Sequence, residues 1–286
     1  MSNGVLIFAH NSTALDYALM SIIAGGLAKK HLNVPISLAT DENTVLWMKT
    51  SNIYDRATEI FDKIILIEKP KTNNQRKLHD GDHSEMIPFT NTNRTSAWDI
   101  TPYERTLLID SDYLIFTNAL NEYWSSTDVL ISNAMNDIND NSRAGYHDRY
   151  VSDTGVHMYW ATTVMFSKND AGKRFFELVN YVKNNYQYYG DVFRFDTRQY
   201  RNDIAFSITK HILDGFETDS ITTLPPVLTA IDRDMLHSVD ATGKLTFLVS
   251  PKMDSKFVVT SLANTDIHIM NKQSIIRNAT SLLELI

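Results

Sequence analysis

The sequence predicts an α/β protein in which a mixed, mostly parallel sheet is flanked by helices. Short apolar runs alternate with helical patterns in the first part of the chain, and this order predicts parallel strands joined by right-handed crossovers. A later apolar run, residues 105–109, ends in two carboxylates, as expected of a buried strand reaching the ligand-binding edge of such a sheet. With 286 residues, no internal repeat and no clean linker, we expect a single domain over residues 1–286.

The first part of the chain predicts three strands and two helices. Residues 5–9 (VLIFA) form an apolar run typical of a buried strand. Residues 14–31 place apolar side chains at helical spacing, with Asn11, Ser12 or Thr13 as the expected N-cap. The predicted elements that follow are a strand at 36–39, a helix at 44–49 and a strand at 63–67.

The same patterns predict the remaining elements. Residues 68–89 and 135–154 are dense in polar side chains and are predicted as loops. Helices are predicted at 94–101, 169–184, 202–213 and 274–286, and strands at 105–109, 113–116, 128–133 and 159–166. Further sheet or loop is predicted at 227–237 and 245–249, and a short strand around His268.

Composition excludes several classes of function. The net charge of −7 argues against a protein that binds chiefly to nucleic-acid backbone, although it leaves room for a local basic face. Without cysteine there is no disulfide, thiol nucleophile or cysteine zinc site. The segment MSNGVLIFAHNS has no basic region before its short apolar run, so we expect a first strand rather than a signal peptide. No apolar stretch is long enough to span a membrane, and we expect a soluble, cytoplasmic protein.

The most informative motif is Asp110-Ser111-Asp112, directly after the apolar run at 105–109. In extended chain, carboxylates at i and i+2 project to the same side. Two hard oxygen ligands with no thiol nearby suit Mg²⁺ or Mn²⁺ rather than zinc. The alternative is a surface turn, because Asp-Ser-Asp is also favourable turn chemistry.

Taken in order, the motifs resemble those of GT-A-type glycosyltransferases, in particular the glycogenin-like and bacterial galactosyltransferase-like retaining group. The matching segments are Ala9-His10-Asn11, Arg94, Asp110-Ser111-Asp112, Ala161-Thr162-Thr163-Val164, and His268 with Lys272. Asn202-Asp203 falls where that family has an amide-and-acid pair at a helix start. Two departures are that Thr163 replaces the usual glycine and that Lys272 follows His268 by four residues rather than six, without the flanking Pro-Trp.

The resemblance implies a metal-dependent transfer of a sugar from a nucleotide-diphosphate sugar to an acceptor. It implies Mn²⁺ or Mg²⁺ as cofactor and a UDP-sugar as donor, with residues 1–118 holding the nucleotide and residues 119–286 the acceptor. The implied metal ligands are Asp110, Asp112 and His268, and the implied catalytic residues are Asp203, Asn202 and Arg94. The implied donor-binding residues are Ala9, His10, Asn11, Arg94, Asp110, Ser111 and Lys272, with Lys252, Lys256 and Arg277 as alternatives for the diphosphate.

One segment of the sequence indicates where the acceptor binds. Residues 186–201 interleave aromatic side chains with Arg194, Arg198 and Arg201, a combination that can stack on sugars or bases and contact phosphates. We therefore expect these arginines near the acceptor, which is a saccharide or a modified DNA base such as hydroxymethylcytosine, as in phage-type DNA glycosyltransferases. The alternative is a buried loop whose arginines pair with Asp191 and Asp196.

Other hypotheses stay open at this point. A nucleotidyltransferase that makes an activated sugar usually begins with a glycine-rich loop carrying a basic residue, and residues 9–13 have neither. A non-catalytic carbohydrate- or nucleic-acid-binding protein would not need the complete set of Asp110, Asp112 and His268. His268 could also be an ordinary strand histidine, Arg94 a surface ion-pair residue, and the polar pairs His10-Asn11 and Asn202-Asp203 simple helix caps.

Overall fold

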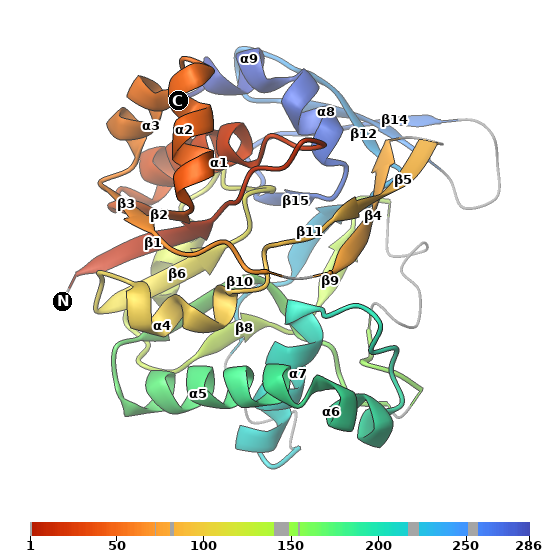
Figure 1. Cartoon of the computed structure of the whole chain (residues 1–286). Helices are drawn as coiled ribbons and strands as arrows, with labels where there is room; N and C mark the ends of the chain where they lie inside the picture. The colour runs from red at the N-terminus through yellow and green to blue at the C-terminus, as the bar shows by residue number, and fades with distance from the viewer. Residues whose placement is uncertain are drawn as a thin grey trace.

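The computed structural model describes residues 2–71, 73–80, 83–139, 149–153, 155–216, 223–250 and 257–286. A six-stranded sheet with the order β3-β2-β1-β6-β10-β8 forms its centre (Figure 1). The four strands from β3 to β6 are parallel, whereas β10 runs antiparallel to both β6 and β8. The predicted α/β class with a mixed, mostly parallel sheet is confirmed. The strands are β1 (Asn3–Phe8), β2 (Ile36–Thr40), β3 (Lys63–Leu66), β6 (Arg105–Ile109), β8 (Leu130–Ser132) and β10 (Trp160–Ser167).

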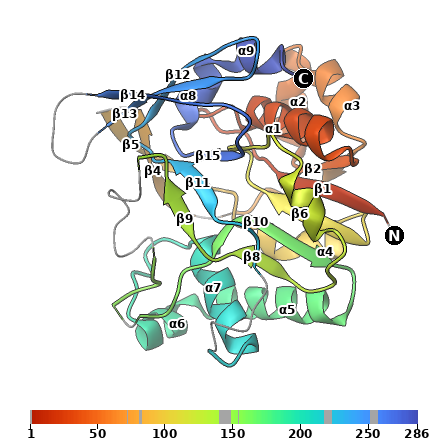
Figure 2. The same ribbon diagram turned by 180° about the vertical axis from the view of Figure 1, so that it is seen from behind.

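Helices cover both faces of this sheet, which explains why its central strands are continuously apolar. Both views place α1, α2 and α3 on one side and α4, α5 and α7 on the other (Figures 1 and 2). All five residues of β6 are buried, as are Val5 to Phe8 of β1. The helices are α1 (Tyr17–Leu32), α2 (Glu42–Thr50), α3 (Tyr54–Ile60), α4 (Ala97–Ile100), α5 (Asp170–Asn184) and α7 (Asn202–Leu213).

A second sheet brings the C-terminal part of the chain to the end of β6. Its order is β7-β15-β11-β9, formed by β7 (Tyr113–Leu114), β15 (Ile267–Ile269), β11 (Val227–Ala230) and β9 (Met135–Asp137). In the antiparallel pairing of β15 with β7, His268 lies opposite Tyr113. This register places His268 beside the acidic motif that precedes β7. The helix α8 (Lys272–Arg277) begins three residues after β15.

A polar hairpin stands at the edge of the molecule. It consists of β4 (Gln75–Asp80) and β5 (His83–Pro88), paired antiparallel from Gln75↔Pro88 to Asp80↔His83. A three-stranded antiparallel sheet lies next to it in both views (Figures 1 and 2). That sheet is β12 (Met235–Val239), β13 (Leu245–Val249) and β14 (Val258–Leu262). The remaining elements are η1 (Arg94–Ser96), η2 (Ala119–Tyr123), α6 (Tyr186–Phe193) and α9 (Ala279–Leu283).

Three segments for which no helix or strand was predicted contain one. Residues 68–89 include the hairpin, whose polar strands show none of the apolar alternation that marks a half-buried strand. Residues 135–154 begin with β9, and 140–148 and 154 lie outside the described residues. Residues 186–201 include α6, which carries Asp191, so this carboxylate lies on a helix and not in a loop.

The ends of several observed helices and strands differ in smaller ways from the predicted ones. The N-cap of α1 is Asp16, whose carboxylate accepts from the Leu19 amide at 2.9 Å, so the expected cap at Asn11, Ser12 or Thr13 is wrong. The predicted C-terminal helix is two short helices, α8 and α9, and neither α3 nor β14 was predicted. The helix at 202–213 has the predicted bounds. Across the described residues, no helix combines the length and apolarity needed to cross a membrane.

Candidate functional site

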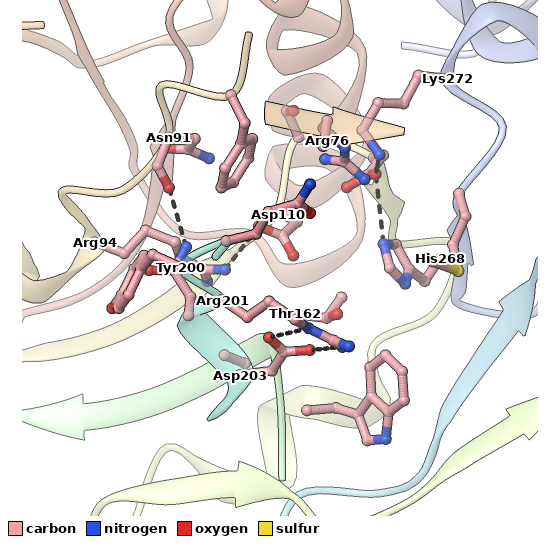
Figure 3. A pocket seen from close by; sticks show the side chains of 18 of the residues that line it. Arg76, Asn91, Arg94, Asp110, Thr162, Tyr200, Arg201, Asp203, His268 and Lys272 are labelled. Carbon is pink, nitrogen blue, oxygen red and sulfur yellow. Dashed lines mark hydrogen bonds and ion pairs between the residues drawn. The ribbon is translucent and has the colours of Figure 1, made fainter. Parts of the chain in front are cut away.

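A cavity of about 330 Å³ lies where β6 ends, between the hairpin, the start of α7 and the segment after β15 (Figure 3). Eight of the eleven residues implied above as metal-ligating, catalytic or donor-binding line this one cavity, although they are spread over most of the chain. They are Arg94, Asp110, Ser111, Asp112, Asn202, Asp203, His268 and Lys272. The fold therefore assembles most of the predicted site.

The acidic motif and His268 form a cluster with metal-ligating chemistry. Asp110, Asp112 and His268 can each offer one ligand atom, and these atoms lie within 4.8 Å of one another. The Nε2 atom of His268 is 3.4 Å from Asp112 Oδ2, and Nδ1 of the same ring is buried without a hydrogen-bond partner. Tight Mg²⁺ coordination has bonds of about 2.0–2.1 Å, so its ligand atoms lie at most about 4 Å apart. A small side-chain adjustment would satisfy that limit, and two carboxylates with an imidazole suit Mn²⁺ or Mg²⁺.

Lys272 shares Asp112 with His268. Its ammonium forms an ion pair with the Asp112 carboxylate, and the side chains of both residues are buried. Burial acts to raise the pKa of Asp112, but Lys272 and His268 outweigh it and hold that pKa well below its ordinary value. Burial lowers the pKa of Lys272 below its ordinary value, and Arg76 acts in the same direction while Asp112 opposes it. Asp112 is therefore a carboxylate at neutral pH.

Arg94 lies beneath the other carboxylate of the motif. Its Nη1 donates to Asp110 Oδ1 at 2.7 Å, and the side chain is only 2% exposed. The hypothesis that Arg94 is merely a surface ion-pair residue is therefore wrong. Burial raises the pKa of Asp110 above its ordinary value, and Arg94 only partly offsets this effect. The two acids of the motif thus sit in different electrostatic environments.

The start of α7 supplies an amide and a third carboxylate. The Asn202 side chain donates to the Asn91 carbonyl at 3.0 Å. Asp203 is held in an ion pair by Arg201, whose Nε is 3.2 Å from Asp203 Oδ1. Burial acts to raise the pKa of Asp203, but Arg201 and backbone hydrogen bonds bring it below its ordinary value. Figure 3 shows the Arg201–Asp203 pair on the side of the cavity away from Lys272.

Several buried polar atoms around this cavity have no hydrogen-bond partner among the described residues. Besides Nδ1 of His268, they include Nε and Nη2 of Arg94, Oδ1 of Asn91, Oδ1 of Asn202 and the hydroxyl of Tyr200. Leaving such groups unpaired costs about 1–3 kcal/mol each, so their clustering on one cavity calls for polar partners there, either water or a polar ligand. Donors and acceptors are both present in the set.

The predicted nucleotide-binding segment lies beside the main cavity and does not line it. His10 Nδ1 is 2.7 Å from Asp41 Oδ2, and His10 lines a smaller recess with Tyr17, Phe89, Thr90 and Asn91. Asn11 is used by the fold: its Oδ1 accepts from the Ala18 amide at 2.8 Å, in the first turn of α1. Ala9 and Asn11 are not among the residues that line the main cavity.

The three arginines of residues 186–201 do not act together. Arg201 lines the cavity, whereas Arg198 pairs with Asp196. The alternative hypothesis expected this pair, but in a buried loop, and the Arg198 side chain is exposed. Arg194 ends α6 in a left-handed conformation with φ 58° and is exposed. The aromatic rings of Tyr186, Phe195 and Tyr200 pack on one another instead of facing solvent.

Sequence reasoning missed further residues of the cavity. Arg76, Lys77 and Gln75 come from the hairpin, Tyr17 from α1 and Trp160 from β10. One signal for the hairpin was present, because Gly81-Asp82 between two stretches of equal length is a favoured two-residue turn sequence. Nothing in the sequence indicated which face of the hairpin would meet the acidic motif.

Comparisons with known proteins complete the description. No protein-family model matches the sequence, and no curated protein matches it. The solved structure of the glycosyltransferase GlyE of Streptococcus pneumoniae TIGR4 is similar with a TM-score of 0.45 and 12% identity, over 78% of this chain and 45% of the GlyE chain. The galactosyltransferase LgtC, in complex with donor and acceptor sugar analogs, gives a TM-score of 0.43 and 15% identity, over 72% of this chain and 70% of the LgtC chain. A third similar structure is the bifunctional glycosyltransferase WbbM, with a TM-score of 0.38 and 12% identity over 63% of this chain and 34% of the WbbM chain. This chain therefore spans less than half of the GlyE chain that it matches.

Proposed function

We propose that this protein is a metal-dependent glycosyltransferase that moves a sugar from a nucleotide-diphosphate sugar to an acceptor hydroxyl. The observation that carries the proposal is the convergence of Asp110, Asp112 and His268 on one cavity that also contains Arg94, Arg76 and Lys272. A divalent ion and fixed positive charges are what a departing diphosphate requires, because its negative charge grows as the glycosidic bond breaks.

The unpartnered polar atoms support a sugar as the transferred group. A hexose presents several neighbouring hydroxyls, each of which donates one hydrogen bond and accepts others. Arg94 offers two nitrogens, Nε and Nη2, as free donors. Asn91 and Asn202 offer free amide oxygens as acceptors, and the Tyr200 hydroxyl can donate or accept. A site built to hydrogen-bond hydroxyl groups discriminates strongly against ligands that lack them.

Residue roles follow from position in the cavity. Asp110, Asp112 and His268 would hold Mn²⁺ or Mg²⁺, which would neutralise charge on the diphosphate when bound. Lys272 would contribute a positive charge to the same group. Arg94 and Asn202 would orient the donor sugar, and Asp203 would face the reacting carbon. In the transfer, the acceptor oxygen bonds to the anomeric carbon as the bond from that carbon to the diphosphate breaks, and the hydroxyl proton passes to a base.

Two finer assignments belong to this proposal. UDP is the nucleotide, with Ser111, Ala9, His10 and Asn11 on its nucleoside side, and residues 119–286 form most of the acceptor side. Arg201 and Trp160 line the cavity beside Asp203 and are the groups that an acceptor would meet first. The acceptor is a saccharide or a modified DNA base, and the assay below tests both classes. A cytoplasmic location is a separate prediction.

The test is nucleotide binding followed by transfer. Calorimetric titration of UDP should show binding that strengthens at least about tenfold when Mn²⁺ is added, because an ion held by Asp110, Asp112 and His268 would attract the charged diphosphate. Mass analysis of a saccharide panel and of hydroxymethylcytosine-containing DNA, each incubated with several UDP-sugars, then identifies the acceptor. Binding of saccharide or DNA with no response to UDP and Mn²⁺ would contradict the proposal and favour a non-catalytic binding protein. Release of pyrophosphate from UTP and a sugar phosphate would instead favour the nucleotidyltransferase.

A further inference from the structure

The hairpin β4–β5 brings a basic side chain to the acidic motif. Arg76 of β4 lines the main cavity together with Tyr17, Asp110, Asp112 and Lys272. Figure 3 shows the side chains of Arg76 and Lys272 converging at one end of the cavity. Arg76 comes from a segment near the middle of the first half of the chain, whereas Lys272 begins α8, so only the fold brings these two cations together.

Anchors at both ends hold the hairpin in this place. At its base, Asn74 Nδ2 donates to the Tyr200 carbonyl at 2.9 Å, and the Tyr200 amide donates back to Asn74 Oδ1 at 2.8 Å. Near its tip, the Arg277 guanidinium donates to both oxygens of Asp80 at 2.6 and 2.8 Å. Arg76 lies between these anchors, and its position is therefore set by the segment before α7 and by α8.

Arg76 is half-buried and has no carboxylate of its own, unlike three other cations of the cavity. Arg94 pairs with Asp110, Lys272 with Asp112 and Arg201 with Asp203. Among the described residues no carboxylate forms an ion pair with Arg76, and its guanidinium lies 5.3 Å from the centre of the Phe89 ring. The three carboxylates that line the cavity are thus already paired.

The charge in the cavity is opposite to that of the protein. Five basic side chains line it, Arg76, Lys77, Arg94, Arg201 and Lys272, against the three carboxylates Asp110, Asp112 and Asp203. This leaves a surplus of two positive charges inside a chain whose net charge is −7. Arg76 and Lys272 lie at the same end of the cavity, and two close cations repel each other. An anion bound between them would remove that repulsion.

We propose that Arg76 is a diphosphate-binding residue that acts with Lys272, an inference that rests on the proposed function. A diphosphate offers two adjacent charged groups, which matches two cations at one end of the cavity. The planar fork of Arg76 can donate two parallel hydrogen bonds to phosphate oxygens, whereas the lysine acts as a point charge. Lys272, Lys252, Lys256 and Arg277 were the candidates from sequence; Arg277 is engaged with Asp80, and Lys252 and Lys256 lie outside the described residues.

The test uses inorganic pyrophosphate, which carries the relevant charge without base or sugar. Its affinity is measured calorimetrically with Mn²⁺ present for the wild type, Arg76→Gln and the control Arg174→Gln, which removes an exposed arginine of α5 far from the cavity. Because a hydrogen bond to a charged group is worth more than a neutral one, Arg76→Gln should weaken binding about tenfold or more. The control should stay within about twofold of the wild type, and uridine affinity should not change in either variant.

The outcomes separate the two proposals. If the wild type binds pyrophosphate and UDP and Arg76→Gln binds them equally well, the role of Arg76 is refuted and the proposed function stands. If the wild type binds neither ligand with Mn²⁺, the proposed function itself fails. Should Arg76→Gln not fold, Arg76→Lys replaces it: this variant keeps the charge but loses the fork and should weaken pyrophosphate binding about threefold or more. Unchanged affinity in Arg76→Lys would then refute the role.

Discussion

At the scale of the residue, the main feature of the site is that Asp110 and Asp112, two positions apart, have pKa values shifted in opposite directions. Asp112 is surrounded by Lys272 and His268, and its pKa is held low, while burial keeps the pKa of Asp110 high despite Arg94. Asp110-Ser111-Asp112 does form a turn, in which the Tyr113 amide donates to the Asp110 carbonyl at 3.2 Å, so the extended geometry expected from the sequence is wrong. The alternative of a surface turn is also wrong, because a surface turn would leave both carboxylates solvated. Ser111 and Asp112 are instead 3% and 4% exposed.

Asp112→Ala should abolish Mn²⁺-dependent UDP binding and lower transfer by about 100-fold or more, because it removes a carboxylate shared by the ion site and Lys272. The measurement is calorimetry with and without Mn²⁺, together with a transfer assay. Asp191→Ala, at an exposed position of α6, is the matched control and should behave as the wild type. Turnover of Asp112→Ala at the wild-type rate would exclude the metal site.

His268→Ala should weaken Mn²⁺-dependent UDP binding in the same direction, by about tenfold or more. The reason is that its Nε2 is 3.4 Å from Asp112 and its Nδ1 has no other partner. Affinity for UDP without metal should change little, since the ring would act on the nucleotide only through the ion. Equal Mn²⁺ dependence in mutant and wild type would make His268 an ordinary strand residue.

At the scale of the element, the hairpin β4–β5 is the segment whose position matters most for the cavity. Of its strands only Leu78 and Ile87 are buried, one side chain each in the hydrophobic core, so polar contacts contribute much of what holds the hairpin in place. Its anchors are the hydrogen bonds at Asn74 and the ion pair at Asp80. Polar anchors of this kind respond to pH and salt, unlike a buried apolar face.

Arg277→Gln should destabilise the protein slightly at neutral pH and not at low pH. Hydrogen bonds from Arg277 lower the pKa of Asp80 below its ordinary value of about 3.9, so the pair stabilises the fold above that pH. This contribution is lost as the pH falls through the depressed pKa and Asp80 takes up a proton in the folded state. For an exposed pair it amounts to less than about 1 kcal/mol.

The check for this pair is the difference in thermal midpoint between the wild type and Arg277→Gln, measured at pH 7 and again near pH 2. The difference should shrink toward zero at the lower pH. Arg56→Gln, which breaks the exposed pair with Glu59 on α3, serves as a comparison remote from the hairpin. Were the Arg277→Gln difference equally large at both pH values, the ion pair would not be its cause.

At the scale of the whole molecule, the central sheet fixes the position of the acidic motif in the cavity. β6 lies between β1 and β10, and Leu108 pairs with Leu6 on one side and Val164 on the other. All three side chains are fully buried. The acidic motif follows this strand directly, so its position depends on the packing of the core.

Leu108→Ala should lower the free energy of unfolding by about 2–5 kcal/mol, through lost burial and the cavity left behind. Urea denaturation followed by circular dichroism measures the change. Leu213→Ala at the end of α7 is the matched control, because that side chain is 40% exposed and should change stability by no more than about 0.5 kcal/mol. A loss at Leu108 no larger than at Leu213 would contradict the packing described for β6.

The sequence alone determined the features that depend on neighbouring residues. Apolar runs predicted the strands of the central sheet, and helical patterns predicted α1, α5 and α7. These predictions were possible because the pattern of buried side chains is visible within each short segment of sequence. The polar strands of the hairpin escaped prediction because they lack that periodicity. The helix α6 was missed although Tyr186, Tyr189 and Phe193 lie at helical spacing, because the segment was interpreted by its mixture of aromatic and arginine side chains. The acidic motif, Arg94, Asn202, Asp203, His268 and Lys272 were found as separate short motifs, and order along the chain alone suggested that they belong together.

Only the tertiary structure decided which of these residues meet. Lys272 reaches Asp112 across 160 positions of sequence, and His268 joins them because β15 pairs with β7 rather than with a strand of the central sheet. Arg76 could not be assigned to the site from sequence, since its place depends on anchors at Tyr200 and Arg277 that are distant in the chain. The side chain of Asn11 accepts a hydrogen bond from the first turn of α1, a contact that the sequence also did not indicate. Such contacts depend on long-range packing, which no local pattern of residues records.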